Sequence, residues 1–224
     1  MPNVSVIIVA AGSGLRLGAN IPKAFVKING RPMVEYSLKA FQECKSVAEI
    51  ILVKPASYQV NGIKYFDRYS KLSAVVSGGK ERLDSVRAGL DLVSPDSEIV
   101  LIHDAARPMI RAEQITAVAR AAEKYGAAIL AAPVSDTIKK VRKGRITCTV
   151  DRSQLWKAQT PQGFKMSVLQ RSHFNRKNSP VTDDSQLVER MKGNVHIVPG
   201  DDCNIKITTP IDLEIASWFL KKKK

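Results

Sequence analysis

The stretch VIIVAAGSGLRLGANIPKAF, residues Val6 to Phe25, decides the fold. Its apolar start is typical of a buried strand, and glycines follow that strand directly. Glycine allows backbone N–H groups to approach the oxygens of an anion closely. Arg16 and Lys23 add positive charge at the loop, and Pro22 restricts the backbone that leads to Lys23. The stretch therefore predicts a strand that delivers backbone groups and cations to an anion.

Two common kinds of phosphate loop do not match this one. A Walker loop needs Gly-Lys-Ser/Thr, whereas Leu15-Arg16 follows Gly14 here. A dinucleotide-binding loop needs G-x-G-x-x-G, and Gly18 comes one residue too late for that spacing. A glycine loop with two cations suits a triphosphate better than a diphosphate bridge. The plainer alternative is that both cations are ordinary solvated side chains.

Apolar runs rich in Val and Ile alternate with segments of helical period along the rest of the chain. The expected strands are Val4–Ala11, Glu49–Val53, Ala74–Ser77, Ile99–His103, Ala127–Val134 and Val195–Val198. Helices are expected after Asn29-Gly30 with Pro32 in the first turn, over Gly62–Tyr69, Glu81–Val93, Ala112–Tyr125 and Met166–Phe174, and through Met191. The last helix is expected to start at the N-cap Thr209, with Pro210 next and Asp212 three residues after the cap, which is a capping-box spacing. Alternation of this kind predicts an α/β fold with a mostly parallel, twisted sheet and helices on both faces.

The pattern changes at Ile138, where IKKVRKGRITCTV has two short alternating runs around Lys143-Gly144. This is typical of a β-hairpin. Because an isolated hairpin is marginally stable in water, we expect this one to pack on its own domain or on another subunit. A solvated basic hairpin on the same chain is the alternative.

Net charge, aromatic content and cysteine number limit the classes of protein to which this chain can belong. The 224 residues carry a net charge of +14, which is compatible with nucleic acid, an anionic membrane surface, a small polyphosphate, or solubility alone. Aromatic residues make up 6% and the basic residues are scattered, which disfavours a nucleic-acid surface built on stacking. No apolar run approaches the ~20 residues of a membrane span, and we expect no membrane partner. Three distant cysteines predict neither disulfides nor a zinc site and favour the cytoplasm.

Further motifs follow in order: VSGGKERLDSVRAGL, LIHDAARPMI, PVSDTIKKV, TVDRSQLWKAQTPQGF, VTDDSQLVER and NIKITTPIDLEIA. Together with AAGSGLRLG and Pro22-Lys23, they make the chain resemble the 2-C-methyl-D-erythritol 4-phosphate cytidylyltransferase family from about Val4 to Ala216. The resemblance implies a Rossmann-like nucleotidyltransferase fold, with residues 1–224 as one domain. It also implies that residues 136–153 form a β-arm that clasps a second subunit in a homodimer.

The resemblance also implies the reaction. CTP and the sugar-alcohol phosphate, 2-C-methyl-D-erythritol 4-phosphate, would give the CDP-alcohol and pyrophosphate, with Mg²⁺ as cofactor. The acceptor phosphate, already ionised at neutral pH, would attack the α-phosphorus in line, so that positioning and charge neutralisation replace a general base. Ribitol 5-phosphate, used by a related cytidylyltransferase, is the alternative acceptor. A non-catalytic nucleic-acid-binding protein is the remote alternative.

The family's functional positions are carried over to matching residues of this sequence. The resemblance implies catalytic cations at Arg16, Lys23 and Lys206. It implies nucleotide contacts at Ala10, Ala11, Gly12, Gly14, Gly78, Gly79, Ser85, Asp104 and Ala105. It implies acceptor contacts at Asp104, Thr137, Arg152, Thr160 and Thr182, with Asp104 also the expected metal ligand.

Three further positions, Ala24, His103 and Arg107, lie in or beside these motifs. Many family members have Gln after the Pro-Lys pair, whereas this chain has Ala24, so any hydrogen bond from that amide is absent or supplied elsewhere. His103 is expected to be structural. Arg107 is expected to form an ion pair and is left out of the catalytic set.

Overall fold

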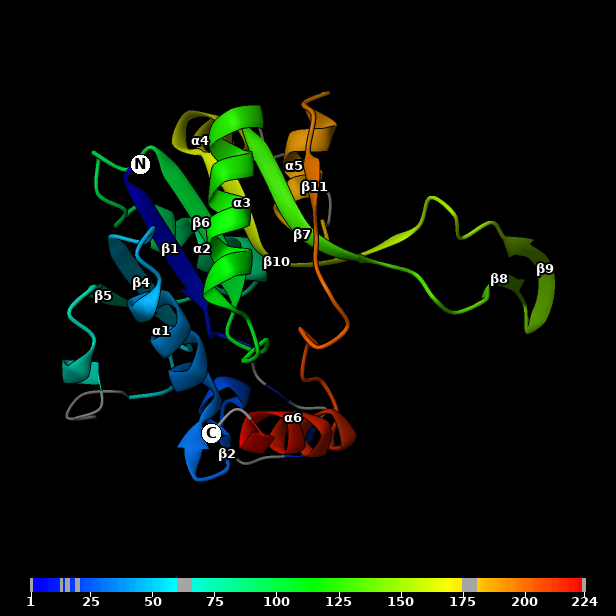
Figure 1. Cartoon of the computed structure of the whole chain (residues 1–224), viewed down its shortest axis with the longest axis horizontal. Coiled ribbons are helices and arrows are strands. Elements are labelled where there is room, and N and C mark those ends of the chain that lie inside the picture. The colour runs from blue at the N-terminus through cyan, green and yellow to red at the C-terminus, as the bar shows by residue number, and fades with distance from the viewer. Residues whose placement is uncertain are drawn as a thin grey trace.

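The computed structural model has a seven-stranded central sheet with helices on both faces (Figure 1). It describes residues 2–12, 14, 17–18, 21–59, 66–174 and 181–222. The strand order is β11-β7-β10-β6-β1-β4-β5. The strands of this sheet are β1 (Val4–Val9), β4 (Glu49–Lys54), β5 (Leu72–Ser77), β6 (Ile99–Asp104), β7 (Ala127–Pro133), β10 (Trp156–Lys165) and β11 (His196–Pro199).

The sheet is parallel except at β10, which runs antiparallel to both of its neighbours, β6 and β7. The prediction of a mostly parallel sheet is therefore confirmed. Strand β10 is not among the strands expected from the sequence. Its sequence, WKAQTPQGFK, combines polar residues with a proline, a pattern that argues against a central strand when read alone. Pro161 lies in a bulge between Ala158 and Gln162, where the regular pairing of β10 with β7 is interrupted. A proline, which has no backbone N–H to donate, is tolerated at such a position.

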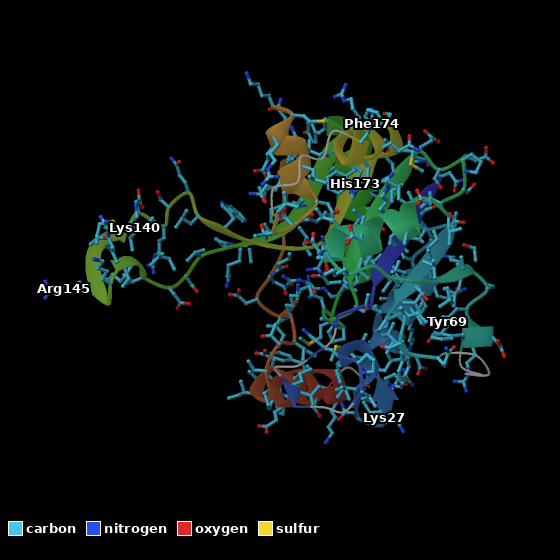
Figure 2. All side chains as sticks on the ribbon, turned by 180° about the vertical axis from the view of Figure 1, so that it is seen from behind. Lys27, Tyr69, Lys140, Arg145, His173 and Phe174 are labelled. Atoms are coloured by element: carbon cyan, nitrogen blue, oxygen red, sulfur yellow. The ribbon has the colours of Figure 1, made fainter. Side chains whose placement is uncertain are left out.

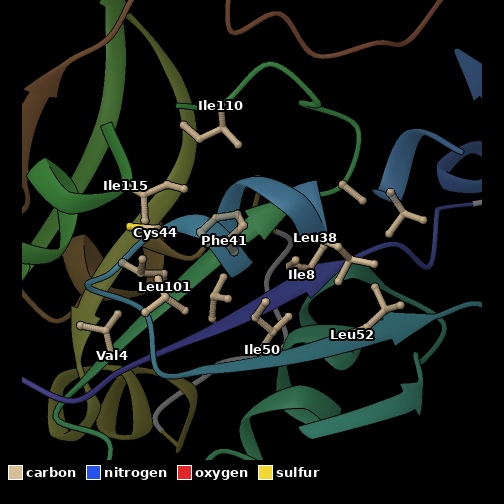
Figure 3. Close-up of a cluster of buried hydrophobic side chains, with 14 of the residues drawn as sticks. Val4, Ile8, Leu38, Phe41, Cys44, Ile50, Leu52, Leu101, Ile110 and Ile115 are labelled. Atoms are coloured by element: carbon tan, nitrogen blue, oxygen red, sulfur yellow. The ribbon is translucent and has the colours of Figure 1, made fainter. Parts of the chain in front are cut away.

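The helices form two layers. They are α1 (Met33–Glu43), α2 (Arg82–Leu90), α3 (Ala112–Tyr125), α4 (Met166–Phe174), α5 (Ser185–Arg190) and α6 (Pro210–Lys222). Helices α1 and α3 cover one face and pack Leu38, Phe41 and Ile115 into a core with β1 and β6 (Figure 3). Helices α2, α4 and α5 cover the other face through residues such as Val86 and Leu169.

Helix α6 lies below the sheet, against a short hairpin of β2 (Lys27–Ile28) and β3 (Arg31–Pro32). Its start has the predicted capping box, because Asp212 accepts the Thr209 N–H at 2.8 Å and Thr209 Oγ1 accepts the Asp212 N–H at 3.5 Å. Burial would raise the pKa of Asp212, but hydrogen bonds from Thr208 and Thr209 lower it to about 2. The cap fixes the start of α6, and Ala216 of this helix packs in one apolar cluster with Ile28 of β2.

Most predicted boundaries are correct within a few residues. The predicted helix over Gly62–Tyr69 lies partly outside the described residues, and the described part contains a short 3₁₀ helix, η3 (Phe66–Arg68). A second 3₁₀ helix, η2 (Lys23–Phe25), follows Pro22. Among the described residues, no helix is both long and apolar enough to cross a bilayer.

The predicted hairpin is present as β8 (Ile138–Arg142) and β9 (Arg145–Val150). Lys143 and Gly144 at its turn both have positive φ, as the favoured two-residue hairpin turns require. The arm extends away from the rest of the chain in Figure 1, with Lys140 and Arg145 near its far end in Figure 2. Its side chains are almost all exposed, including the apolar Val141 and Ile146.

The close packing of β10 against α3 depends on Gly163. A Cβ at this position would lie 2.9 Å from both Leu101 Cδ2 and Val118 Cγ1. We expect Gly163→Ala to lower the free energy of unfolding by about 1–3 kcal/mol, because the added methyl group forces neighbouring side chains to shift. Urea denaturation measures this change. An unchanged unfolding midpoint would contradict the prediction, because it would show that α3 accommodates the added methyl group without loss of stability.

Candidate active site

A cleft of about 380 Å³ lies at the carboxyl ends of β1 and β6. Open α/β sheets bind ligands at this edge. The lining residues come from five separate segments: Val9, Ala10, Ala11, Gly12, Lys23, Ala24, Gly79, Lys80, Glu81, Arg82, Ser85, Asp104, Ala105, Ala106 and Lys206. The tertiary structure thus brings together both ends of the chain and the middle of the sequence.

The glycine loop brings Lys23 to the cleft. Gly14 has a φ of +72°, and a Cβ at this position would lie 2.6 Å from the Cβ of Lys23. Any other residue at position 14 would therefore push Lys23 away. Lys23 begins the 3₁₀ helix that follows Pro22, and it lines the cleft with the buried Ala24. The predicted catalytic residue Arg16 lies outside the described residues.

A second pair of glycines, Gly78 and Gly79, lies in the turn between β5 and α2. A Cβ on Gly78 would lie 2.6 Å from Ser85 Oγ and 2.7 Å from Ala11 Cβ, so the turn after β5 packs directly on α2 and on the loop after β1. Gly79 and Ser85 line the cleft, whereas Gly78 is not one of its lining residues. The buried Ser85 hydroxyl donates to the Glu81 carbonyl at 3.2 Å.

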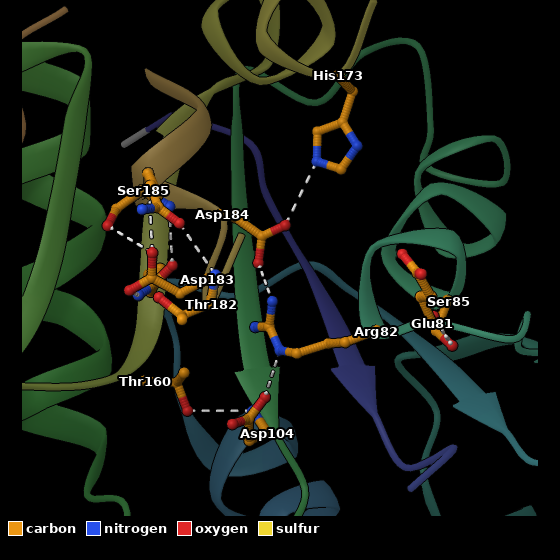
Figure 4. Close-up of polar contacts among 12 residues, drawn as sticks. Glu81, Arg82, Ser85, Asp104, Thr160, His173, Thr182, Asp183, Asp184 and Ser185 are labelled. Carbon is orange, nitrogen blue, oxygen red and sulfur yellow. Dashed lines mark hydrogen bonds and ion pairs between the residues drawn. The ribbon is translucent and has the colours of Figure 1, made fainter. Parts of the chain in front are cut away.

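Asp104 is the polar centre of the cleft (Figure 4). Arg82 Nε donates to its Oδ1 at 3.1 Å, and Lys206 Nζ donates to its Oδ2 at 2.6 Å. Burial alone would raise the pKa of this carboxyl, but Arg82 and Lys206 reverse the effect and hold the pKa well below its usual range. Asp104 is therefore a permanent anion between two cations at neutral pH.

Lys206 enters the cleft from an irregular segment before α6. The Ile207 N–H donates to the Ala106 carbonyl at 2.8 Å and joins this segment to the loop after β6. The lysine side chain remains 42% exposed. Two of the three predicted catalytic residues, Lys23 and Lys206, thus line one cleft.

Of the predicted acceptor contacts, the structure brings Thr160 to Asp104. Thr160 lies in the β10 bulge, and its Oγ1 accepts the Asp104 N–H at 3.0 Å. Thr182 is exposed in the segment before α5. Thr137 and Arg152 are exposed at the base of the arm and do not line this chain's own cleft. The Arg152 guanidinium instead donates to the Ser135 carbonyl.

Arg107 differs from the ion-pair expectation. Its Nη1 donates to the Asn204 carbonyl at 2.7 Å and its Nη2 to the Ala158 carbonyl at 3.1 Å. The buried Asn204 in turn donates to the Thr160 carbonyl at 3.0 Å. These bonds clamp the Lys206 segment to the β10 bulge. Sequence reasoning gave no signal for this, because carbonyl partners cannot be read from residue types.

Sequence reasoning also missed Arg82. A signal was available, because Arg82 follows the Gly78-Gly79 pair and opens a helix at the edge of the sheet where ligands bind. Its second guanidinium nitrogen, Nη1, donates to Asp184 Oδ2 at 2.5 Å. The aspartate lies in the predicted acceptor segment, directly after Thr182 and Asp183.

The carboxylates Asp104 and Glu81 are the groups of the lining suited to a hard cation. Across the described part of the chain, no three His, Cys, Asp or Glu side chains cluster to hold a metal by themselves. Magnesium usually takes one or two carboxylates and obtains its other ligands from phosphates and water. Each Asp104 oxygen has one cationic partner and retains a lone pair, so the residue fits such a site as a single ligand.

His103 is fully buried next to Asp104, as expected for a structural residue. Its Nδ1 lies 3.1 Å from Thr160 Oγ1, and its Nε2 lies 3.2 Å from the Arg107 carbonyl. A neutral ring that accepts at Nδ1 and donates from Nε2 satisfies both contacts. Burial lowers the pKa of His103 to about 3, and the nearby Arg107 charge acts in the same direction, although Asp104 opposes it.

The mostly parallel sheet, the glycine loop and the cations that meet at its carboxyl edge are those of the α/β nucleotidyltransferases. The family model described as 2-C-methyl-D-erythritol 4-phosphate cytidylyltransferase matches residues 4–222. The chain belongs to this family.

Individual relatives agree with this membership. The chain is 42% identical to the 2-C-methyl-D-erythritol 4-phosphate cytidylyltransferase of Syntrophus aciditrophicus, over 99% of this chain and 97% of the relative. It is 44% identical to that of Bacillus mycoides, over 98% and 99%. Among solved structures, 4-diphosphocytidyl-2C-methyl-D-erythritol synthase from Anaerococcus prevotii has a TM-score of 0.84 and 32% identity, over 98% of this chain and 99% of that structure.

The buried neutral His103 predicts a pH-dependent stability. The unfolded chain protonates this ring near pH 6.5, whereas the folded chain does so near pH 3. Between these values the unfolded state binds more protons, so the free energy of unfolding should fall by about 1.4 kcal/mol per pH unit as the pH decreases. The His103→Gln variant should be less stable than wild type at pH 7. Its free energy of unfolding should also depend less on pH, because the contribution from protonation of His103 is removed. Urea denaturation at pH 7, 5.5 and 4.5 measures it. Parallel slopes for wild type and variant would contradict a buried neutral ring.

Proposed function

We propose that the protein transfers the cytidylyl group of CTP to 2-C-methyl-D-erythritol 4-phosphate and releases pyrophosphate. The observation that carries this proposal is membership of the cytidylyltransferase family over residues 4–222. The cleft supports it, because Lys23 and Lys206 lie in one lining with the glycine loop, as a triphosphate requires.

The residues of the cleft would act by position and charge. Ala10, Ala11 and Gly12 would contact the nucleotide through backbone groups, while Gly79 and Ser85 would line the pocket for the base. Lys23 and Lys206, with Arg16, would neutralise the charge that develops as the acceptor phosphate attacks the α-phosphorus in line and pyrophosphate leaves. Because the acceptor phosphate is already ionised, the mechanism requires no general base.

We propose Mg²⁺ as the cofactor, with Asp104 as the protein ligand. The metal would supply charge neutralisation on the phosphate oxygens of the nucleotide. Asp104 is suited to this role because its two cationic neighbours keep it ionised at neutral pH.

We also propose that the protein is a homodimer in which the arm of one subunit completes the site of the other. The arm exposes Val141, Ile146 and many basic side chains. Because an isolated two-stranded hairpin is only marginally stable in water, we infer that a second subunit covers part of the arm. Thr137 and Arg152 at its base would then contact the acceptor in the partner's site, with Thr160 and Thr182 contributed by that partner. We propose a cytoplasmic location from the odd number and wide spacing of the three cysteines in the sequence.

Pyrophosphate release tests the reaction. We expect release only when CTP, Mg²⁺ and 2-C-methyl-D-erythritol 4-phosphate are present together. A parallel assay replaces the acceptor with ribitol 5-phosphate. Turnover with ribitol 5-phosphate and none with the methylerythritol phosphate would assign the chain to the alternative acceptor.

Mixing of inactive variants tests the shared site. Lys23→Ala and Arg152→Ala should each lower kcat/KM by about 10²–10³-fold, because each removes a positioned cation from a phosphate. After subunit exchange, an equal mixture should recover about a quarter of wild-type activity, since half of the dimers are mixed and each mixed dimer has one intact site. Lys27→Ala, an exposed lysine on β2 outside the cleft lining, is the matched control and should keep full activity. A mixture no more active than its components would contradict the cross-subunit arrangement.

A further inference from the structure

Arg82 joins two carboxylates that are far apart in the sequence. Its Nε donates to Asp104 Oδ1 at 3.1 Å, and its Nη1 donates to Asp184 Oδ2 at 2.5 Å (Figure 4). With Lys206 on the other oxygen of Asp104, the charges alternate as Asp184, Arg82, Asp104 and Lys206. We call these four residues the charge row.

The inner end of the charge row is fixed. The Asp184 side chain is 0% exposed, and its Oδ1 lies 3.3 Å from His173 Nε2 without hydrogen-bond geometry. Movement of Arg82 into the cleft would leave a buried carboxylate without its arginine partner, which is a costly state. Burial alone would lower the pKa of Arg82, and the two carboxylates, Asp184 first, raise it well above its ordinary value.

The outer end of the charge row is not held in this way. The Lys206 side chain is 42% exposed, compared with 25% for Arg82. Its described ion pair is with Asp104, whose side chain is 11% exposed, whereas the Asp184 carboxylate that holds Arg82 is 0% exposed. Asp104 keeps its pair with Arg82 when Lys206 turns to a phosphate oxygen, so this movement costs less than a movement of Arg82 away from the fully buried Asp184.

We propose that Arg82 is a positioning residue for the transfer reaction: Asp184 holds Arg82, and Arg82 orients the carboxylate of Asp104 that presents Lys206 to the phosphates. This inference rests on the function proposed above. Under this proposal the two cations paired with Asp104 have different roles: Lys206 contacts the phosphates, and Arg82 holds Asp104 in position without contacting them.

The charge row also connects the nucleotide side of the cleft to the acceptor segment. Asp183, next to Asp184, accepts a hydrogen bond from Gln162 Nε2 at 2.8 Å, and the Ser185 N–H donates to Gln162 Oε1 at 3.2 Å. These bonds hold the segment with Thr182 on β10. The Asp184–Arg82 pair joins the same segment to α2 and Asp104, so one network positions both sides.

Asp184→Asn tests the role of the inner carboxylate. The variant keeps an oxygen that accepts from Arg82 but removes the charge that retains it. We expect kcat to fall on the order of 10²-fold, the loss associated with small misplacements of catalytic groups. The Kd of CTP, measured by calorimetry with Mg²⁺, should stay within about threefold of wild type or become tighter, because a released Arg82 can turn toward the triphosphate.

A double-mutant cycle tests whether the pair acts as a unit. We expect Arg82→Gln and Asp184→Asn together to lose no more kcat than the worse single variant. Arg82→Lys keeps the charge, but one ammonium does not reproduce the fork between two carboxylates, so a partial loss is expected. Arg87→Gln removes the same charge from an exposed position of α2 outside the cleft lining, and it should match wild type.

The outcomes are distinguishable. Arg82→Gln that weakens CTP binding tenfold or more with kcat preserved would make Arg82 a direct phosphate ligand and overturn the proposal. Losses that multiply in the double variant would also overturn it. If Asp184→Asn fails to fold, Arg82→Lys still decides, because a wild-type kcat in that variant contradicts the assignment. A wild type that releases no pyrophosphate refutes the proposed function instead.

Discussion

The carboxylate of Asp104 between Arg82 and Lys206 is the interaction on which the cleft depends. A buried anion at the carboxyl end of a central strand is costly unless cations compensate it. Here one cation comes from the helix after β5 and the other from the segment before the last helix. The charge balance therefore joins distant parts of the chain at the edge of the sheet where the glycine loop and Lys23 also lie.

The antiparallel strand β10 gives this arrangement its geometry. It is inserted between β6 and β7, and its bulge places Thr160 against the backbone of Asp104 and the ring of His103. Arg107 and Asn204 then tie the bulge to the segment that carries Lys206. The polar residues of β10, which argue against a buried strand in isolation, are the residues that the site uses.

The arm, unlike β10, has a structure that the local sequence predicts. Its turn chemistry is sufficient to predict a hairpin, because Lys143-Gly144 accommodates two residues with positive φ. Its apolar side chains Val141 and Ile146 are cross-strand partners and remain largely exposed to solvent. Local sequence thus specifies the shape of the arm, and a second surface would be needed to specify its function.

The sequence by itself determined the α/β class, most helices and parallel strands, the glycine loop, the hairpin and the family, because these depend on periodicity, turn residues and motif order. It also predicted Lys23, Lys206 and Asp104 as site residues, and all three line the cleft. Only the tertiary structure decided the position of β10, the carbonyl partners of Arg107 and the pairing of Arg82 with Asp184. These depend on contacts between residues as many as 102 positions apart, and no local pattern records which distant side chains meet.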